Sequence, residues 1–525
     1  MKKTYIVIAI AFLCTSAKAQ EISDALRYSV DNLNGTARYR SMSGAFGALG
    51  GDLSSINVNP AGSAVFNNNQ LGLTISNYNT KNNSNYFGTQ TSDSENSFDL
   101  NQAGGVFVFK NHNRNADWTK IAFAVNYENT NNFDNAKFSA GVNPTNSIAN
   151  YFLSYANFSN GGGPIPQEYV NTVSGESISD LYSFLANNFP NLQYPNLSGF
   201  SAQQAMLGVQ GKIIKPEDNN SNSRYISNVR EGGNYYQENA IYSNGYNGKL
   251  SFNFSSSYKD KLYIGINLNS HFSNYTQSSR FYEDNDNTLT NEDRITRMRF
   301  SNDLYTNGTG FSFQIGAIVK ATEELRFGAA YESPTWMNLS DELTQRLSSV
   351  SSNTSGELPT DVIDPRITNY YAPYRLQTPS KFTASAAYVF GKKGLISIDY
   401  SIKDYNNVKF RPTNDDYYRD LNAEMNATLK TSGELRIGAE YKIKALSLRG
   451  GYRMEKSPYK NKTTIGDLTG YSGGLGYNFG ATRVDLAYSY AKRNYQQGFF
   501  STGLTNAASI DAINNNVSLT LLFEL

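Results

Sequence analysis

Residues 261–271 read KLYIGINLNSH, and their apolar and polar side chains alternate. Successive side chains of a strand point to opposite sides, so this pattern gives one apolar face and one polar face. The apolar face is Leu262, Ile264, Ile266 and Leu268, and the polar face is Asn267, Asn269 and His271. A strand of this kind suits a wall with lipid on one side and a polar lumen on the other.

The same alternation recurs after residue 68, and the segments are separated in turn by very short and by long polar connections. Short turns at 259–261 and 391–394 match the periplasmic turns of outer-membrane barrels, and the longer connections match their external loops. The segments lie at 69–80, 97–110, 119–131, 246–258, 261–276, 308–320, 324–339, 380–390, 395–411, 428–443, 446–458, 469–480, 482–496 and 513–525. The sequence therefore predicts an all-β fold, a transmembrane antiparallel β-barrel of about fourteen strands over 69–525, with both termini on the periplasmic side.

The last predicted strand runs to the final residue of the chain and has one wholly apolar face. That face is Val517, Leu519, Leu521, Phe523 and Leu525. An apolar terminal strand suits closure of a barrel, and it resembles the C-terminal signal of bacterial outer-membrane proteins, although an aromatic last residue is commoner there.

Composition fits a barrel although the chain is polar on average, with a mean hydropathy of −0.51. Lipid-facing and lumen-facing residues alternate in barrel strands, so a polar average is compatible with membrane insertion. The 38 Tyr and 30 Phe residues suit the membrane interface, and a Tyr-rich soluble sandwich is the alternative. No later stretch reaches the roughly 18 apolar residues of a helical span. A net charge of +1 argues against nucleic acid as a partner.

The N-terminus has the order of a secretory signal peptide: Lys2-Lys3, the apolar run Tyr5 to Leu13, then Ala17-Lys18-Ala19. We expect residues 1–19 to be removed on export to the outer membrane, so that the mature chain begins at Gln20. A lipid anchor on Cys14 is disfavoured because Leu13 stands where a small residue is needed. The mature chain then has no cysteine, hence no disulfide and no thiolate metal ligand.

Residues 20–68 do not read as strands. Glycines at high density allow close backbone packing or positive φ, and Pro60 lacks the N–H that a sheet ladder needs. Irregular backbone at membrane depth is tolerated only inside protein or beside water, so we expect this segment to plug the barrel lumen. Its candidate residues along the ligand path are Gly44, Gly47, Gly50, Gly51, Asp52, Asn59, Pro60 and Ala61.

The plug resembles the N-terminal hatch of the FadL/TodX-type outer-membrane transport family. A small-residue and glycine run, an acidic residue and then Asn-Pro-Ala before the first strand recur in that order there, and here they are Gly44 to Gly51, Asp52 and Asn59-Pro60-Ala61. The resemblance implies a plugged barrel, an outer groove that captures ligand and a kinked strand that opens the wall sideways. Members move long-chain fatty acids and other hydrophobic molecules. Residues lining the path of characterised members have no one-to-one match here.

The connection 132–245 is the longest in the chain and carries helical spacing of apolar residues. The spaced residues are Ile148, Tyr151, Phe152 and Tyr155, then Ile178, Leu181, Phe184 and Leu185 after a capping Ser177, with a weaker candidate helix over 201–210. These faces either pack on one another over the barrel mouth or form the wall of an apolar groove for lipid-like molecules.

Catalytic and metal motifs are weak. His112 falls in a polar turn and His271 is predicted to face the lumen, where a Ser–His pair is conceivable but unmarked by any motif. No phosphate-binding glycine loop is present. An acidic loop, Asp284, Asp286, Asn287, Glu292 and Asp293, lacks the spacing of a hand-type calcium site. We therefore expect no enzyme activity, cofactor or metal.

Charged residues are predicted on the lumen faces of several strands. They are Arg326, Glu332, Asp399, Arg436, Glu440, Arg449, Arg453, Arg483 and Asp485. Their mixed signs indicate ion pairs that hold the plug to the wall, or a polar lining for an aqueous passage.

Two functions remain open. The first is passive uptake of hydrophobic small molecules, long-chain fatty acids above all, by a barrel surrounded by outer-membrane lipids. The second is a scaffold, in which the barrel is a subunit of a larger secretion or assembly complex with protein partners.

Overall fold

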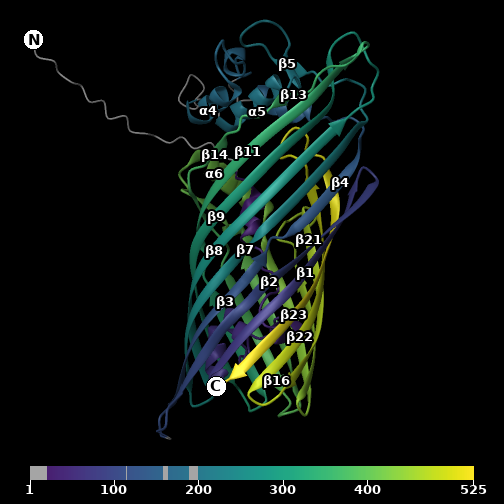
Figure 1. The fold of residues 1–525 in the computed structure, drawn as a ribbon. Helices are drawn as coiled ribbons and strands as arrows, with labels where there is room; N and C mark the ends of the chain where they lie inside the picture. The colour runs from purple at the N-terminus through teal and green to yellow at the C-terminus, as the bar shows by residue number, and fades with distance from the viewer. Residues whose placement is uncertain (1–19, 114, 158–162, 189–198) are drawn as a thin grey trace, which may run out of the picture.

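Fourteen strands close into an antiparallel barrel in the computed structural model, which describes residues 20–113, 115–157, 163–188 and 199–525 (Figure 1). The predicted signal peptide lies outside these residues. The wall strands are β1 (Gln70–Tyr86), β2 (Thr89–Lys110), β3 (Trp118–Asn132), β7 (Tyr235–Tyr258), β8 (Leu262–Asp284), β9 (Arg294–Lys320), β10 (Leu325–Glu332), β16 (Lys381–Val389), β17 (Gly394–Asp404), β19 (Thr431–Ile443), β20 (Leu446–Glu455), β21 (Ile465–Asn478), β22 (Thr482–Gly498) and β23 (Ala507–Glu524). β1 pairs with β23 from Gln70↔Glu524 onward, which closes the wall and confirms the predicted barrel.

The outward side chains of a single strand show which part of the barrel faces lipid. On β9 these side chains are apolar from Val319 through Ile315 to Phe311, and they give way to Thr309 and Asn307. This stretch is roughly 27 Å along the strand, which suits the apolar band of an outer-membrane barrel. β9 then continues to Arg294, so its outer part stands clear of the apolar band.

Three wall strands are interrupted at one end of the barrel. β10 breaks at residues 333–335 and continues as β11 (Trp336–Asn353), and both pair with β9. β15 (Tyr374–Gln377) precedes β16 across the break at 378–380, and η5 (Tyr405–Asn407) separates β17 from β18 (Lys409–Arg411). The predicted continuous strands 324–339 and 395–411 are therefore wrong, because Pro334 cannot donate to a ladder and η5 turns the chain.

A helix covers the edge that these breaks leave. α6 (Asp416–Thr428) occupies the start of the predicted strand 428–443, which begins instead at Thr431. The side chain of Asn422 accepts a hydrogen bond from the Phe410 N–H (2.8 Å) and donates to the Phe410 carbonyl (2.9 Å). An amide side chain thus replaces a neighbouring strand at β18. The remaining short strands there are β12 (Gly356–Glu357), β13 (Asp361–Ile363) and β14 (Thr368–Tyr370).

The plug fills the lumen, as predicted. It contains α1 (Ile22–Arg27), α2 (Ala37–Ser41), η1 (Leu53–Asn57) and η2 (Pro60–Val65). η2 contacts β7, β8 and β9, whereas α2 contacts β21, β22 and β23 on another side. Gln20 is buried and bonds to Asp341 of β11 and Tyr417 of α6. The C-terminus lies at the opposite end of the barrel from Gln20 (Figure 1). The expectation that both termini lie on the periplasmic side is therefore wrong for a chain that begins at Gln20, because the plug runs through the lumen before β1 begins.

A helical cap stands over the end of the barrel remote from the C-terminus (Figure 1). The predicted long connection is shorter than expected, because β4 (Asn135–Asn143) pairs with an early start of β7. The cap contains α3 (Ala149–Asn157), η3 (Gln167–Tyr169), α4 (Ile178–Asn188), α5 (Gly199–Gln210), β5 (Ile214–Pro216) and β6 (Tyr225–Ser227), so all three expected helices are confirmed. No helix in the described part of the chain is both long and apolar enough to cross a membrane.

Candidate functional site in the plugged lumen

A buried chain of ion pairs joins the plug to one side of the wall. Glu440 of β19 lies between Arg38 of α2, at 2.9 Å, and Arg449 of β20, at 2.6 Å. Arg449 also contacts Asp485 of β22 at 2.7 Å, and Arg483 contacts the second oxygen of Asp485 at 2.8 Å. Both carboxylate side chains are fully buried. A buried charge is destabilising unless it is paired. The paired network therefore holds the plug in place against the wall.

Backbone groups of the plug are bound by two further side chains. One carboxylate oxygen of Asp399, on β17, accepts the N–H groups of Phe46 and Gly47, both at 2.9 Å. The amide of Asn59 donates to the carbonyls of Gly47 (2.7 Å) and of Ala317 on β9 (2.9 Å). The plug is therefore tied to strands on both sides of the lumen.

The other predicted lumen charges also face the plug or its surroundings. Arg326 donates to the Leu49 carbonyl at 3.2 Å, and Arg436 donates to the Tyr39 hydroxyl at 2.9 Å. Arg453 pairs with the neighbouring Glu455, and Glu332 lies opposite Lys381 in the β10–β16 ladder. Among these nine charges, Glu440 forms an ion pair with the plug, and Arg326, Asp399 and Arg436 hydrogen-bond to it. Arg449, Arg453, Arg483 and Asp485 pair with other residues of the wall.

The predicted plug glycines occupy positions that a larger residue would strain. A Cβ on Gly47 would overlap the Ser385 hydroxyl, which shows how closely the plug approaches β16. Gly50 has a φ of +63°, and its Cβ would lie 2.9 Å from the Cα of Gly62. Gly44 and Gly51 also have positive φ. These glycines permit tight packing in the observed state.

The motif residues after the glycines cap the two short helices of the plug. Asp52 accepts hydrogen bonds from the Ser54 N–H (3.0 Å) and the Thr36 hydroxyl (2.7 Å) at the start of η1. Asn59 accepts the Ala61 N–H at 3.1 Å at the start of η2, where Pro60 takes the first helical position. Ala61 is fully buried against the wall. These residues therefore shape the plug rather than face open space.

Asp31 forms a second charged attachment that the sequence reasoning did not single out. Its carboxylate lies 3.0 Å from Lys381 and 2.8 Å from Lys403. Burial alone would raise the pKa of Asp31, but the two ammonium groups hold that pKa well below its usual range. Arg38, the plug residue that pairs with Glu440, is likewise absent from the predicted candidates. A charged residue inside a segment assigned to the lumen is the sequence signal that identifies such attachments.

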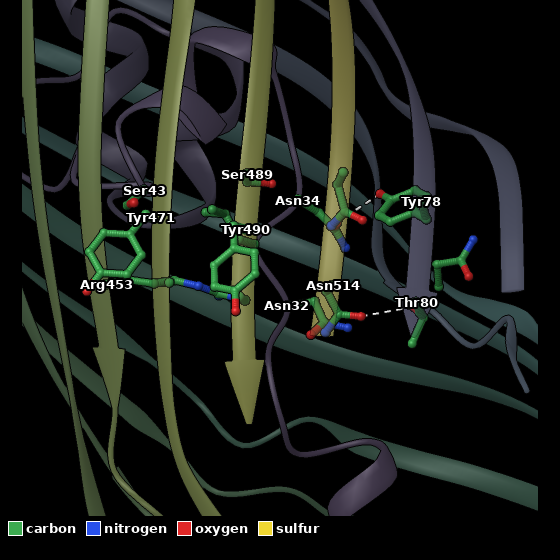
Figure 2. Close-up of a pocket in the computed structure, with 15 residues that line it drawn as sticks. Asn32, Asn34, Ser43, Tyr78, Thr80, Arg453, Tyr471, Ser489, Tyr490 and Asn514 are labelled. Atoms are coloured by element: carbon green, nitrogen blue, oxygen red, sulfur yellow. Dashed lines mark hydrogen bonds between the residues drawn. The ribbon is translucent and has the colours of Figure 1, made fainter. Parts of the chain in front are cut away.

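A polar cavity lies between the plug and β1, β22 and β23 (Figure 2). The Tyr78 hydroxyl donates to Asn34 and the Thr80 hydroxyl donates to Asn514, both at 2.9 Å. The cavity has a volume of about 60 Å³, room for about two waters, and a second cavity beside Lys403 has about 30 Å³. Pockets for drug-sized ligands hold roughly 300–1,000 Å³. Neither cavity admits a lipid chain without movement of the plug.

The wall itself is interrupted between β2 and β3. Their backbone ladder ends at Gln102↔Glu128, and beyond it residues 89–101 have a ladder with β1 alone in the part of the chain that the structure describes. Side chains still bridge the two strands there, because Asn129 donates to Asp99 and Asn132 donates to Ser97 at 3.3 Å. β4 continues the third strand but turns inward, where Ser139 bonds to the inward-facing Ser84 of β1 at 2.6 Å. The break begins where β2 still carries exposed Leu100 and Phe98. It therefore starts within the lipid-facing band.

The predicted groove residues lie together in the core of the cap. Ile148, Tyr151, Phe152, Leu181 and Leu185 are buried, and Tyr155, Ile178 and Phe184 are partly buried against them. Strand tips contribute to the same cluster, for example Phe300, whose ring centroid lies 5.5 Å from that of Phe152. These residues come from both predicted helices, and their side chains pack on one another over the barrel mouth.

The two histidines lie where the sequence placed them. His112 is exposed in the β2–β3 turn. His271 faces the lumen, and its Nε2 lies 2.8 Å from the Ser312 hydroxyl, which is fully buried and also bonds to Asn269. A nucleophile without exposed surface cannot meet a substrate in this state.

The acidic loop is used for protein contacts. Glu292 pairs with Arg294 at 2.7 Å, Asp293 accepts from Asn353 at 2.7 Å, and Asn287 donates to the Gly233 carbonyl at 2.8 Å. Among the described residues, no group of three or more His, Cys, Asp or Glu side chains is placed to hold a metal ion.

Comparison with known proteins accords with this architecture. The family model described as outer membrane protein transport protein (OMPP1/FadL/TodX) matches residues 214–514. Among solved structures, a Pseudomonas aeruginosa FadL homologue has 11% identity and a TM-score of 0.51, with 94% of this chain and 99% of that chain covered. The P. putida toluene transporter TodX has 13% identity and a TM-score of 0.50, with the same coverage. A comparison with curated proteins gives no match. Because the family model spans more than half of its 525 residues, this chain belongs to the OMPP1/FadL/TodX family of outer-membrane transport proteins.

Proposed function

We propose that this protein is a passive channel that carries hydrophobic small molecules through the outer membrane, with long-chain fatty acids or similar lipids as its substrates. The break between β2 and the β3–β4 strand is the observation that carries the proposal. A hydrophobic molecule that leaves through this break enters the lipid band directly and does not have to cross a polar lumen floor.

The proposed path begins at the cap, on the outer side, where ligand partitions among the apolar residues of α3 and α4. It continues into the lumen when the plug shifts at Gly44, Gly47, Gly50 and Gly51, while Asn59-Pro60-Ala61 holds the plug beside β9. Residues 1–19 direct export and are cleaved before Gln20, so N-terminal sequencing of the purified protein gives Gln-Glu-Ile.

Uptake by whole cells tests the function. Cells that lack their own transporter receive this chain or an empty vector, and accumulation of labelled oleate and labelled toluene is timed. Toluene is included because a structural neighbour is named for it. The proposal expects faster accumulation of at least one tracer, and oleate above toluene if lipids are the substrates. Equal rates with the chain and the vector for both tracers would refute it.

A scaffold role in an outer-membrane complex is the second candidate, and close packing of the cap favours it. Five of the eight predicted groove residues are buried against one another, so the cap is a packed unit whose outer surface is available to a partner. Extraction in mild detergent followed by mass spectrometry of lipids and polypeptides separates the two candidates. Co-purifying fatty acids that are lost when the cap is replaced by a short turn favour transport, whereas stoichiometric protein partners without such ligands favour the scaffold.

A further inference from the structure

Two arginines lie directly opposite each other on the outer face of the barrel. Arg375 of β15 and Arg411 of β18 are register partners, and both side chains are exposed. Their neighbours Leu376 and Phe410 are fully buried, so the alternation points both guanidinium groups outward. Lys409 lies on the same outward face, two residues before Arg411. Three cations are thus gathered on two short strands.

Like charges that face each other across strands destabilise a sheet, and no acid relieves this pair. Arg411 donates to the neutral Gln377 side chain at 2.7 Å. Within the described chain, Arg375 and Lys409 have no recorded ion pair. Glu342, an outward acid on β11, lies four residues beyond Asn338, roughly 13 Å along the strand.

Several other exposed arginines on this outer wall are neutralised by carboxylates, and Arg299 of β9 lies instead over the ring of Tyr282. Arg280 pairs with Asp303 at 2.7 Å, and Arg346 pairs with Asp364 at 3.7 Å. Against that background, an uncompensated cluster is a feature of this position and not of the wall in general.

The cluster lies at the border of the lipid-facing band. The ladders put Thr309, Asn338, Arg375 and Arg411 in one row across four strands. The neighbouring row holds the exposed Phe311 and Trp336, the last apolar residues of the band on this side. Lipid headgroups meet the protein at this level, and Trp is a residue of that interface.

We propose that Arg375, Arg411 and Lys409 form a binding site for the phosphate of an anionic lipid headgroup in the outer leaflet. A guanidinium presents a planar fork of donors that matches two phosphate oxygens, and one phosphate between two such forks removes their repulsion. The acyl chains of the same lipid lie along Trp336 and Phe311. Lipid binding at these residues does not require transport, so it stands apart from the proposed function.

Binding of defined lipids to the purified full-length barrel tests the site. Wild-type protein and the double variant Arg375→Gln/Arg411→Gln are titrated in detergent with lipid A and with dephosphorylated lipid A, and bound lipid is counted by native mass spectrometry. We expect the wild type to bind lipid A roughly tenfold more tightly than its dephosphorylated form. The double variant loses that difference.

The matched control is Lys392→Gln/Lys393→Gln, which removes the same charge from the exposed turn between β16 and β17 at the other end of the barrel. It retains wild-type binding. Heat-dependent gel mobility verifies that each variant is folded, and the two single arginine variants replace the double one if it is not. Equal lipid A binding by the wild type and the double variant overturns the site. Displacement of lipid A by equimolar inorganic phosphate overturns its assignment to a lipid.

Discussion

At the scale of single residues, Glu440 is the position where one change has the largest expected effect on stability. Glu440→Gln leaves the guanidinium groups of Arg38 and Arg449 buried without their shared charge partner. Breaking a buried pair costs about 3–5 kcal/mol. We expect a lower urea midpoint for unfolding in detergent, whereas Glu323→Gln, in an exposed turn, leaves the midpoint unchanged. Equal midpoints for both variants would show that the network does not stabilise the barrel.

Alanine substitutions at two plug glycines, Gly47 and Gly51, test how closely the plug packs against the wall. Gly47→Ala places a methyl group against Ser385 and pushes the plug away from Asp399. Gly51→Ala meets nothing nearer than Val65 at 3.7 Å and bears only the cost of a positive φ, about 1–2 kcal/mol. In planar bilayers we expect a higher ion conductance for Gly47→Ala than for Gly51→Ala. The reverse order would contradict the close approach at β16.

Residue roles were predictable from the sequence on the wall and less so in the plug. Period-two alternation fixes which strand residues point inward, so Asp399, Glu440 and Asp485 could be assigned to the lumen. The plug residue that pairs with Glu440 could not be named, because Arg38 lies on α2, a helix of five residues that is too short to show a period. Asp31 was missed because it lies on irregular backbone. The groove residues were placed on the right helices, but helical spacing alone does not distinguish a face that packs from a face that binds.

At the scale of secondary-structure elements, several predicted strands were too short at their outer ends. β8 was expected to stop at residue 276, yet it runs to Asp284. Its outward residues there, Thr276, Ser278 and Arg280, are polar because that part of the strand faces water. Outside the lipid band both faces of a strand are polar, so their polarity no longer differs. A strand there cannot be recognised from alternating apolar and polar residues.

α6 has a testable role as a cover for a sheet edge. Asn422→Ala removes the side chain that bonds to both the N–H and the carbonyl of Phe410, and it leaves that N–H without this acceptor. We expect faster amide hydrogen exchange at residues 409–411. Thr428→Ala at the far end of the helix is the control, since its hydroxyl bonds only within α6. Unchanged exchange in Asn422→Ala would mean that the edge is protected by other contacts.

At the scale of the whole molecule, the plug determines whether the barrel conducts. The two cavities described beside the plug, of about 60 and 30 Å³, hold only a few waters, so we expect the wild-type barrel to conduct ions poorly. Deleting residues 20–68 while keeping the export signal empties the lumen, and we expect large, steady ion currents in planar bilayers. Wild-type currents of the same size would show that the plug does not close the lumen.

The central claim, that hydrophobic molecules pass only when the plug moves, is tested most directly by a reversible crosslink. The single cysteine of the chain is Cys14, within the predicted signal peptide, and the hydroxyls of Ser43 in the plug and Ser472 on β21 lie 2.8 Å apart. Ser43→Cys/Ser472→Cys therefore locks the plug under oxidation, and Thr383→Cys/Ser401→Cys joins two wall strands as the control. Uptake of labelled oleate should stop in the oxidised lock, return with reductant and continue in the control. Undiminished uptake by the fully oxidised lock would contradict the claim.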